Sequence, residues 1–139
     1  MNSSDFQKLS IIRLEEARSL LRNKHYAGAY YLAGYVIECA LKACIAARTK
    51  ATDFPPKPDT VRDYYRHNLV GLLRAAELKE KLEAKCKASK KFESNWDAVI
   101  DWTEQTRYET NIDSQTARMM LRAVGDSRNG VLKWMKSYW

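Results

Sequence analysis

The chain has 139 residues and a formal net charge of +7, with 45% hydrophobic and 29% charged residues. This length suits one domain, residues 1–139, that folds without disulfides or metal, and the composition excludes an intrinsically disordered protein. Five glycines and three prolines are too few for the frequent turns of a many-stranded β fold, so we expect an all-α protein.

A first helix is predicted from about residue 5 to residue 22, beginning with a capping box formed by Ser4 and Gln7. A second, spanning about 26–48, is apolar along nearly its whole length. It is long enough to cross a membrane, but two ionisable residues near its middle and four tyrosines make it a poor membrane span. We expect instead the buried central helix of a bundle or of a dimer.

Prolines predict a loop over residues 49–61. Asn68 is then expected to cap a short helix, and a charged helix follows around 77–89. An amphipathic helix beginning near residue 92 ends near 106–108, and a last helix starts at residue 113 or 114 and can continue to the C-terminus. These elements predict an up-and-down antiparallel bundle of about five helices.

The cysteine pattern favours a reducing compartment. Three cysteines, with no Cys-x-x-Cys pair, do not resemble a secreted disulfide framework, and the N-terminal residues lack a secretory signal pattern. We therefore expect a cytoplasmic protein. Two histidines and three scattered cysteines cannot form a closed zinc site, and the glycines are isolated, so no metal and no other cofactor is expected.

Positive charge is concentrated toward the C-terminus. Residues 113–139 contain five Lys or Arg against two Asp, whereas residues 94–112 contain four acidic residues against Arg107 alone. This asymmetry permits a face that binds nucleic-acid phosphates. Excess lysine also keeps a protein soluble without any ligand, and this explanation has equal weight.

Four short motifs stand in a distinctive order along the chain. They are a leucine pair with a Tyr-x-x-Ala entry, a Glu-x-x-x-Lys pair, a His-x-Leu-x-x-Leu-Leu segment and an Arg-Tyr pair, at residues 20–29, 38–42, 67–73 and 107–108. In this order they resemble the HEPN family, named for higher eukaryotes and prokaryotes nucleotide-binding. The resemblance implies an antiparallel helical bundle that commonly forms a homodimer. It also implies a nucleotidyltransferase partner, in a toxin–antitoxin or defence module.

Many HEPN proteins are metal-independent ribonucleases that use an Arg and, a few residues later, a His, usually on a late helix and with a polar residue directly after the Arg. Arg128-Asn129 matches the opening of this motif, but Lys133 and Trp134 stand where the His is required, and no His follows His67. Arg128 and Asn129 can therefore bind phosphate without cleaving it. The alternative, at even weight, is that Arg128 is an exposed side chain on a helix face.

Arg62 and His67 do have the required interval. The imidazole can transfer a proton at a ribose hydroxyl, and the guanidinium can stabilise charge on the phosphate. His67 also stands at the start of a predicted helix, where a structural hydrogen bond would explain it, and we favour that explanation. Tyr64, Arg66 and Arg107 add aromatic and basic groups that suit RNA, although a loop packed over the bundle explains the tyrosine as well.

Glu38 and Lys42 lie one helical turn apart, in the orientation that favours an ion pair. On so apolar a helix we expect a partly buried structural pair, and a ligand-binding role is the less favoured alternative.

The sequence and the resemblance leave three alternative functions. The first is binding of RNA or nucleotide phosphate together with a nucleotidyltransferase. The second is an endoribonuclease toxin that uses Arg62 and His67, or Arg128 with an unusual partner. The third is a structural homodimeric interaction domain without nucleic-acid contact. A homodimer is expected because the apolar second helix and four tryptophans exceed what a small bundle hides.

Overall fold

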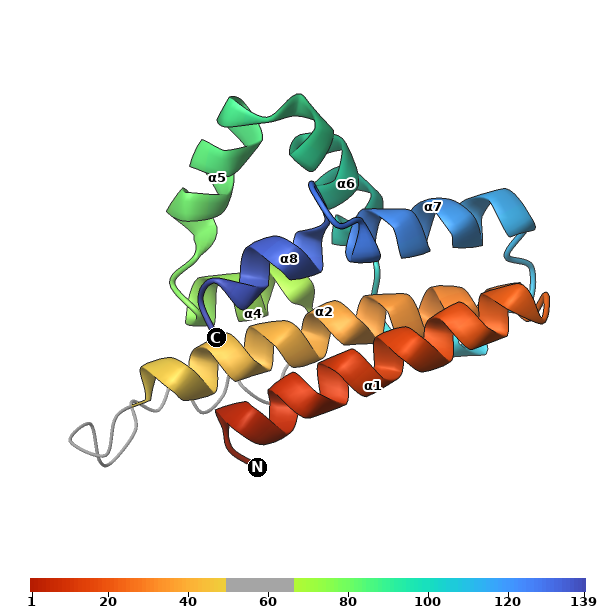
Figure 1. Cartoon of the computed structure of the whole chain (residues 1–139), viewed down its shortest axis with the longest axis horizontal. Helices are drawn as coiled ribbons and strands as arrows, with labels where there is room; N and C mark the ends of the chain where they lie inside the picture. The colour runs from red at the N-terminus through yellow and green to blue at the C-terminus, as the bar shows by residue number, and fades with distance from the viewer. Residues whose placement is uncertain (50–66) are drawn as a thin grey trace.

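The computed structural model describes residues 1–49 and 67–139, which contain seven α-helices, one 3₁₀ helix and no strand. Helices α1 (Ser3–Arg22) and α2 (Tyr26–Arg48) form a long antiparallel hairpin; α4, η2, α7 and α8 pack along α2, whereas α5 and α6 form a hairpin that stands away from it (Figure 1). The all-α fold class is therefore confirmed.

Helix α1 begins earlier than predicted, and the capping box of Ser4 and Gln7 is wrong. The cap is Asn2, whose side-chain oxygen accepts from the Asp5 backbone N–H at 2.9 Å, while the Asp5 carboxylate accepts from the Asn2 backbone N–H at 2.9 Å. Asn followed three residues later by an acidic residue forms the same reciprocal pair as the more familiar Ser and Glu. Further along α1, the Ser10 hydroxyl donates to the Val36 carbonyl and so joins α1 to α2.

Helix α2 forms the centre of the core, as expected. Among the described residues it is the helix long and apolar enough to cross a membrane, yet 12 of its 23 residues are buried by its neighbours in the structure. Small side chains along it let other helices approach closely. Gly34 lies directly against the buried Trp102 ring, whose indole N–H donates to the Tyr31 carbonyl at 3.1 Å.

The second half of the chain folds over α2 as a series of short helices. Asn68 caps α4 as predicted, accepting from the Gly71 N–H at 3.0 Å. A helical hairpin follows and stands away from α1 (Figure 1). The helices in order are α4 (Leu69–Ala75), α5 (Lys79–Ala88), α6 (Lys90–Ile100), η2 (Glu104–Tyr108), α7 (Ser114–Gly125) and α8 (Val131–Lys136).

The last helix is not continuous, which corrects the expectation of one helix to the C-terminus and raises the helix number above five. Helix α7 ends at Gly125, and α8 begins after Gly130. Between them the Asp126 side chain accepts from the backbone N–H groups of Arg128 at 3.1 Å and Asn129 at 2.6 Å. A Cβ at Gly130 would lie 2.4 Å from the Asp126 carbonyl oxygen, so this tight turn requires glycine there.

Candidate functional site

A buried carboxylate lies at the middle of α2. Glu38 is 1% exposed, and its Oε1 accepts from the Lys42 ammonium at 2.9 Å. The Nδ1 atom of His67 lies 2.8 Å from the same oxygen. The other oxygen, Oε2, is buried and has no hydrogen-bond partner among the described residues. The ion pair that the one-turn spacing predicts is therefore formed, and it includes a histidine from the start of α4.

His67 also contacts a second carboxylate. Its Nε2 lies 3.2 Å from the Glu104 Oε2 on η2, and 44% of the His67 side chain is exposed. The position of η2 is set by Trp102, two residues before Glu104, which packs against Gly34. His67 thus connects α2, α4 and η2. The Glu104 carboxylate at the Nε2 side of the imidazole also makes this place unfavourable for a phosphate, because like charges repel.

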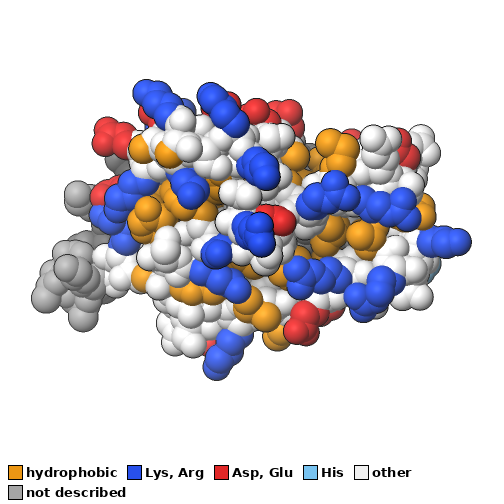
Figure 2. Space-filling view, turned by 45° about the horizontal axis from the view of Figure 1, so that its top comes forward, with side chains coloured by type: hydrophobic (Ala, Val, Ile, Leu, Met, Phe, Trp, Pro, Cys, Tyr) orange, Lys and Arg blue, Asp and Glu red, His pale blue; other side chains and the backbone are white. Residues whose placement is uncertain are grey.

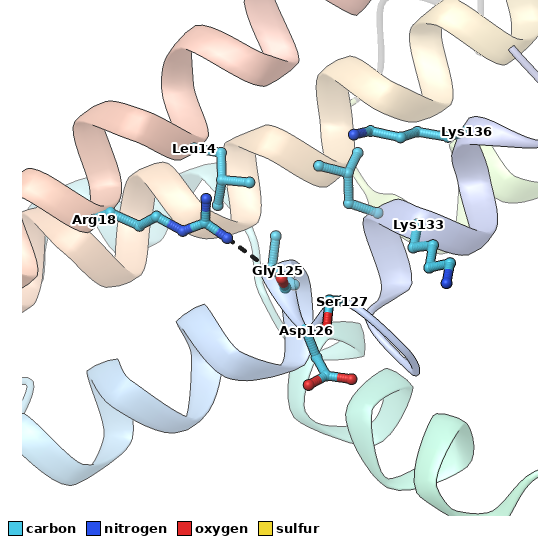
Figure 3. A pocket seen from close by; sticks show the side chains of 9 residues that line it. Leu14, Arg18, Gly125, Asp126, Ser127, Lys133 and Lys136 are labelled. Atoms are coloured by element: carbon cyan, nitrogen blue, oxygen red, sulfur yellow. Dashed lines mark hydrogen bonds between the residues drawn. The ribbon is translucent and has the colours of Figure 1, made fainter.

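A second feature is a hollow of about 260 Å³ between α1, the α7–α8 turn and α8, which we call the basic hollow. Three exposed cations line it: Arg18 from α1, and Lys133 and Lys136 from α8 (Figure 3). The Arg18 guanidinium donates to the Gly125 carbonyl at 3.3 Å, which holds α1 to the end of α7. The other lining residues are Leu14, Val124, Leu132, Gly125, Asp126 and Ser127.

The acidic residue that lines the basic hollow, Asp126, is hydrogen-bonded to backbone N–H groups of the α7–α8 turn. The Asn129 and Arg128 N–H groups hold the pKa of Asp126 below its ordinary value, and they bind its Oδ2 atom. The hollow therefore carries three basic side chains and one carboxylate that is already hydrogen-bonded. Figure 2 shows Lys and Arg side chains spread widely over the face around α7 and α8. Such an arrangement can attract an anion, and its apolar residues can contact a sugar or a base.

A family model described as "HEPN domain" matches residues 9–138. The chain belongs to the HEPN family. This family is linked to RNA-related and nuclease functions. No curated protein and no solved structure shows significant similarity to the chain.

Arg128 and Asn129, which match the opening of the HEPN ribonuclease motif, do not lie on a helix here, which corrects the expectation of one continuous last helix; their binding of phosphate stays a prediction. Both residues occupy the turn between α7 and α8. The Asn129 carbonyl accepts from the Asn95 side chain at 2.8 Å, so this residue is held in a structural contact. The Arg128 side chain is exposed, but in a turn and not on a helix face, and its exposure is compatible both with phosphate binding and with a surface side chain without a ligand.

The remaining predicted residues do not converge on one described site. Arg62, Tyr64 and Arg66 lie outside the described residues, so only His67 of that group has a position. Arg107 lies on η2, is exposed, and places its guanidinium 4.8 Å from the centre of the Tyr108 ring.

The basic hollow was missed by the sequence reasoning. Lys133 and Lys136 belong to the excess of basic residues in 113–139 that predicts a phosphate-binding face, but nothing in the sequence pattern adds Arg18 to them. The spacing of Lys133 and Lys136 does place them on one side of a helix, which is a usable signal. Arg18, however, contacts a residue 107 positions away in the sequence, and only the fold brings the two together.

Proposed function

We propose that this HEPN protein binds RNA or nucleotide phosphate at the basic hollow and does not cleave it there. The observation that carries the proposal is that Arg18, Lys133 and Lys136 all line one hollow (Figure 3). A guanidinium donates to two phosphate oxygens at once, and the two ammonium groups add positive charge close by. The apolar residues beside them suit a ribose or the face of a base.

The size and the surroundings of the hollow support a small charged group as its ligand. Its volume of about 260 Å³ lies just below the ~300 Å³ at which pockets for whole drug-sized molecules begin. A phosphate with its sugar is therefore a better match than a large cofactor. The net charge of +7 adds long-range attraction for a polyanion.

The biological setting of the proposal rests on family membership. A HEPN protein of this kind is proposed to act with a nucleotidyltransferase, in a toxin–antitoxin or defence-type module in the cytoplasm. A homodimer remains part of the proposal. Co-expression with a neighbouring nucleotidyltransferase, followed by co-purification, tests the partnership directly, and separate elution of the two proteins would count against it.

Two variants with the same loss of charge test the hollow. Lys133→Ala/Lys136→Ala removes two cations from it, whereas Lys79→Ala/Lys87→Ala removes two from a different cavity between α5 and α6. The affinity for single-stranded RNA is measured as a function of salt concentration. Each lost phosphate contact lowers the slope of log K against log salt by about 0.7. We expect a reduction of about 1.4 for the first pair, at about 0.7 for each lysine, and little change for the control. Equal losses in both pairs would place the binding elsewhere.

A ribonuclease at Arg62 and His67 is the second candidate, and one observation favours it. The contact between Glu38 and His67 Nδ1 orients the imidazole, as the carboxylate of a catalytic triad does. Against it, Glu104 occupies the side of Nε2, the nitrogen that would transfer the proton. RNA cleavage by the wild type in the presence of a chelator, with loss in His67→Ala, would establish this function.

A further inference from the structure

Beyond the basic hollow, the C-terminal end of α8 carries a cluster of three rings, Trp134, Tyr138 and Trp139, which we call the aromatic platform. The Trp134 ring packs on the buried Phe92 at a centroid distance of 5.5 Å, and Tyr138 packs edge-on against Trp134 at 5.2 Å. All three rings of the platform are partly exposed. They therefore extend from the core outward to the surface, on a rigid base.

Two lysines lie over the faces of the outer rings. The Lys81 ammonium lies 4.9 Å from the centre of the Tyr138 ring, and the Lys136 ammonium lies 5.9 Å from the centre of the Trp139 ring. Both lysines are exposed. Both rings are partly exposed and also pack against the core, so each keeps part of its surface accessible beside an exposed lysine.

The aromatic platform is continuous with the basic hollow. Lys136 both lines the hollow and lies over the Trp139 ring. Through Lys136, the Trp139 ring therefore lies next to the place where a phosphate of the ligand would bind. The combination of a basic groove with outward-facing aromatic rings is the arrangement by which proteins bind single-stranded nucleic acid.

We propose that the aromatic platform stacks unpaired bases of a single-stranded RNA whose backbone lies in the basic hollow. This inference rests on the proposed function and specifies its ligand class. In a duplex the bases are already stacked on one another and show only their edges, so the platform selects single strands. An aromatic ring accepts any base, and sequence preference should be weak. When a base stacks on a ring, Lys81 and Lys136 move off the ring face and can bind the adjacent phosphates.

The test uses the full chain and three RNA probes: an unstructured oligoadenylate, an oligouridylate of the same length, and a fully paired duplex. Trp139→Ala and Tyr138→Ala remove a ring, whereas Trp139→Phe and Tyr138→Phe keep one and serve as matched controls. Circular dichroism confirms that each variant is folded. We expect each alanine variant to lose about tenfold in single-strand affinity, and each phenylalanine variant to keep most of it. Because no charge is removed, the salt slope should remain that of the wild type.

The outcomes separate this inference from the proposed function. If the wild type binds none of the probes, both fail. If single strands bind and the alanine variants match the wild type, only the platform is refuted. If duplex binds as tightly as single strands, the selection for unpaired bases is refuted. Light scattering on the same variants distinguishes a protein partner: a dimer that dissociates in Trp139→Ala with unchanged RNA affinity would make the platform a contact between two copies of the chain.

Discussion

Replacing Gly34 with alanine should destabilise the fold, although alanine in place of glycine inside a helix is normally stabilising. A Cβ at this position would lie 2.1 Å from the Trp102 Cδ1 atom and 2.2 Å from two further atoms of the same ring. The indole cannot easily move away, since it is 1% exposed, stacks on Tyr31 at a centroid distance of 5.9 Å and donates to the Tyr31 carbonyl. Either the indole or the α2 backbone must shift.

The magnitude follows from two opposing effects. Overpacking a well-filled core costs about 1–3 kcal/mol, and displacement of a fully buried indole with a hydrogen bond belongs at the upper end. Alanine in place of glycine inside a helix contributes about 1 kcal/mol in the other direction. We expect a net loss of about 2 kcal/mol in the free energy of unfolding for Gly34→Ala, or roughly 8 °C in Tm for a chain of this size.

A matched control lies on the same helix. A Cβ at Gly28 would meet the Leu20 Cδ1 atom at 3.3 Å, the end of a flexible side chain that can move by a few tenths of an ångström. Gly28→Ala should therefore stay within about 1 kcal/mol of the wild type. Urea unfolding followed by far-UV circular dichroism measures both variants. Equal free energies for the two, or a Gly34→Ala variant as stable as the wild type, would refute the close packing of Trp102 on α2.

Four further outcomes are expected. Glu38→Ala and Glu38→Gln should each lower the free energy of unfolding by about 3 kcal/mol, because both remove the charge that pairs with Lys42; a Glu38→Gln variant as stable as the wild type in urea unfolding would contradict an ionic role. Burial raises the pKa of the Cys39 and Cys44 thiols to about 12, so iodoacetamide at pH 8 should label neither until the protein is unfolded, as mass spectrometry would show. The purified protein should show little or no RNA cleavage in the presence of a chelator, and robust cleavage lost in His67→Ala would overturn this. Light scattering should give twice the chain mass of 16.1 kDa, and a monomer at micromolar concentration would contradict the dimer.

Much of the fold could be predicted because the strongest sequence patterns, an apolar segment and a helix-capping residue, agree with the way the helices pack. The apolar length of α2 predicted a central helix, and Asn68 predicted the start of α4. The break between α7 and α8 was missed although the turn signal was present. Residues 126–130 read Asp-Ser-Arg-Asn-Gly, a composition typical of turns, but apolar periodicity on both sides outweighed it.

The candidate site was harder to predict because its parts are distant in sequence. The Glu38–Lys42 pair lies within one helix turn and was found from its spacing. The partners of His67 come from α2 and η2, and no local pattern joins them. Likewise, the basic hollow depends on how α1 crosses the end of α7, which is a property of the tertiary packing alone.

The surroundings of His67 meet only one of the two requirements that a catalytic imidazole has in a ribonuclease. A catalytic imidazole needs one nitrogen held by an orienting group and the other open to the substrate hydroxyl. Glu38 meets the first need at Nδ1, but Glu104 lies at Nε2. Both ring nitrogens of His67 therefore face carboxylates, and neither is open to a substrate hydroxyl. A phosphate arriving there would also meet the Glu104 carboxylate, whereas the basic hollow presents it with three cations. The proposed RNA binding therefore fits the hollow better than the surroundings of His67, and His67 is better explained as the residue that holds η2 and the start of α4 against the centre of α2.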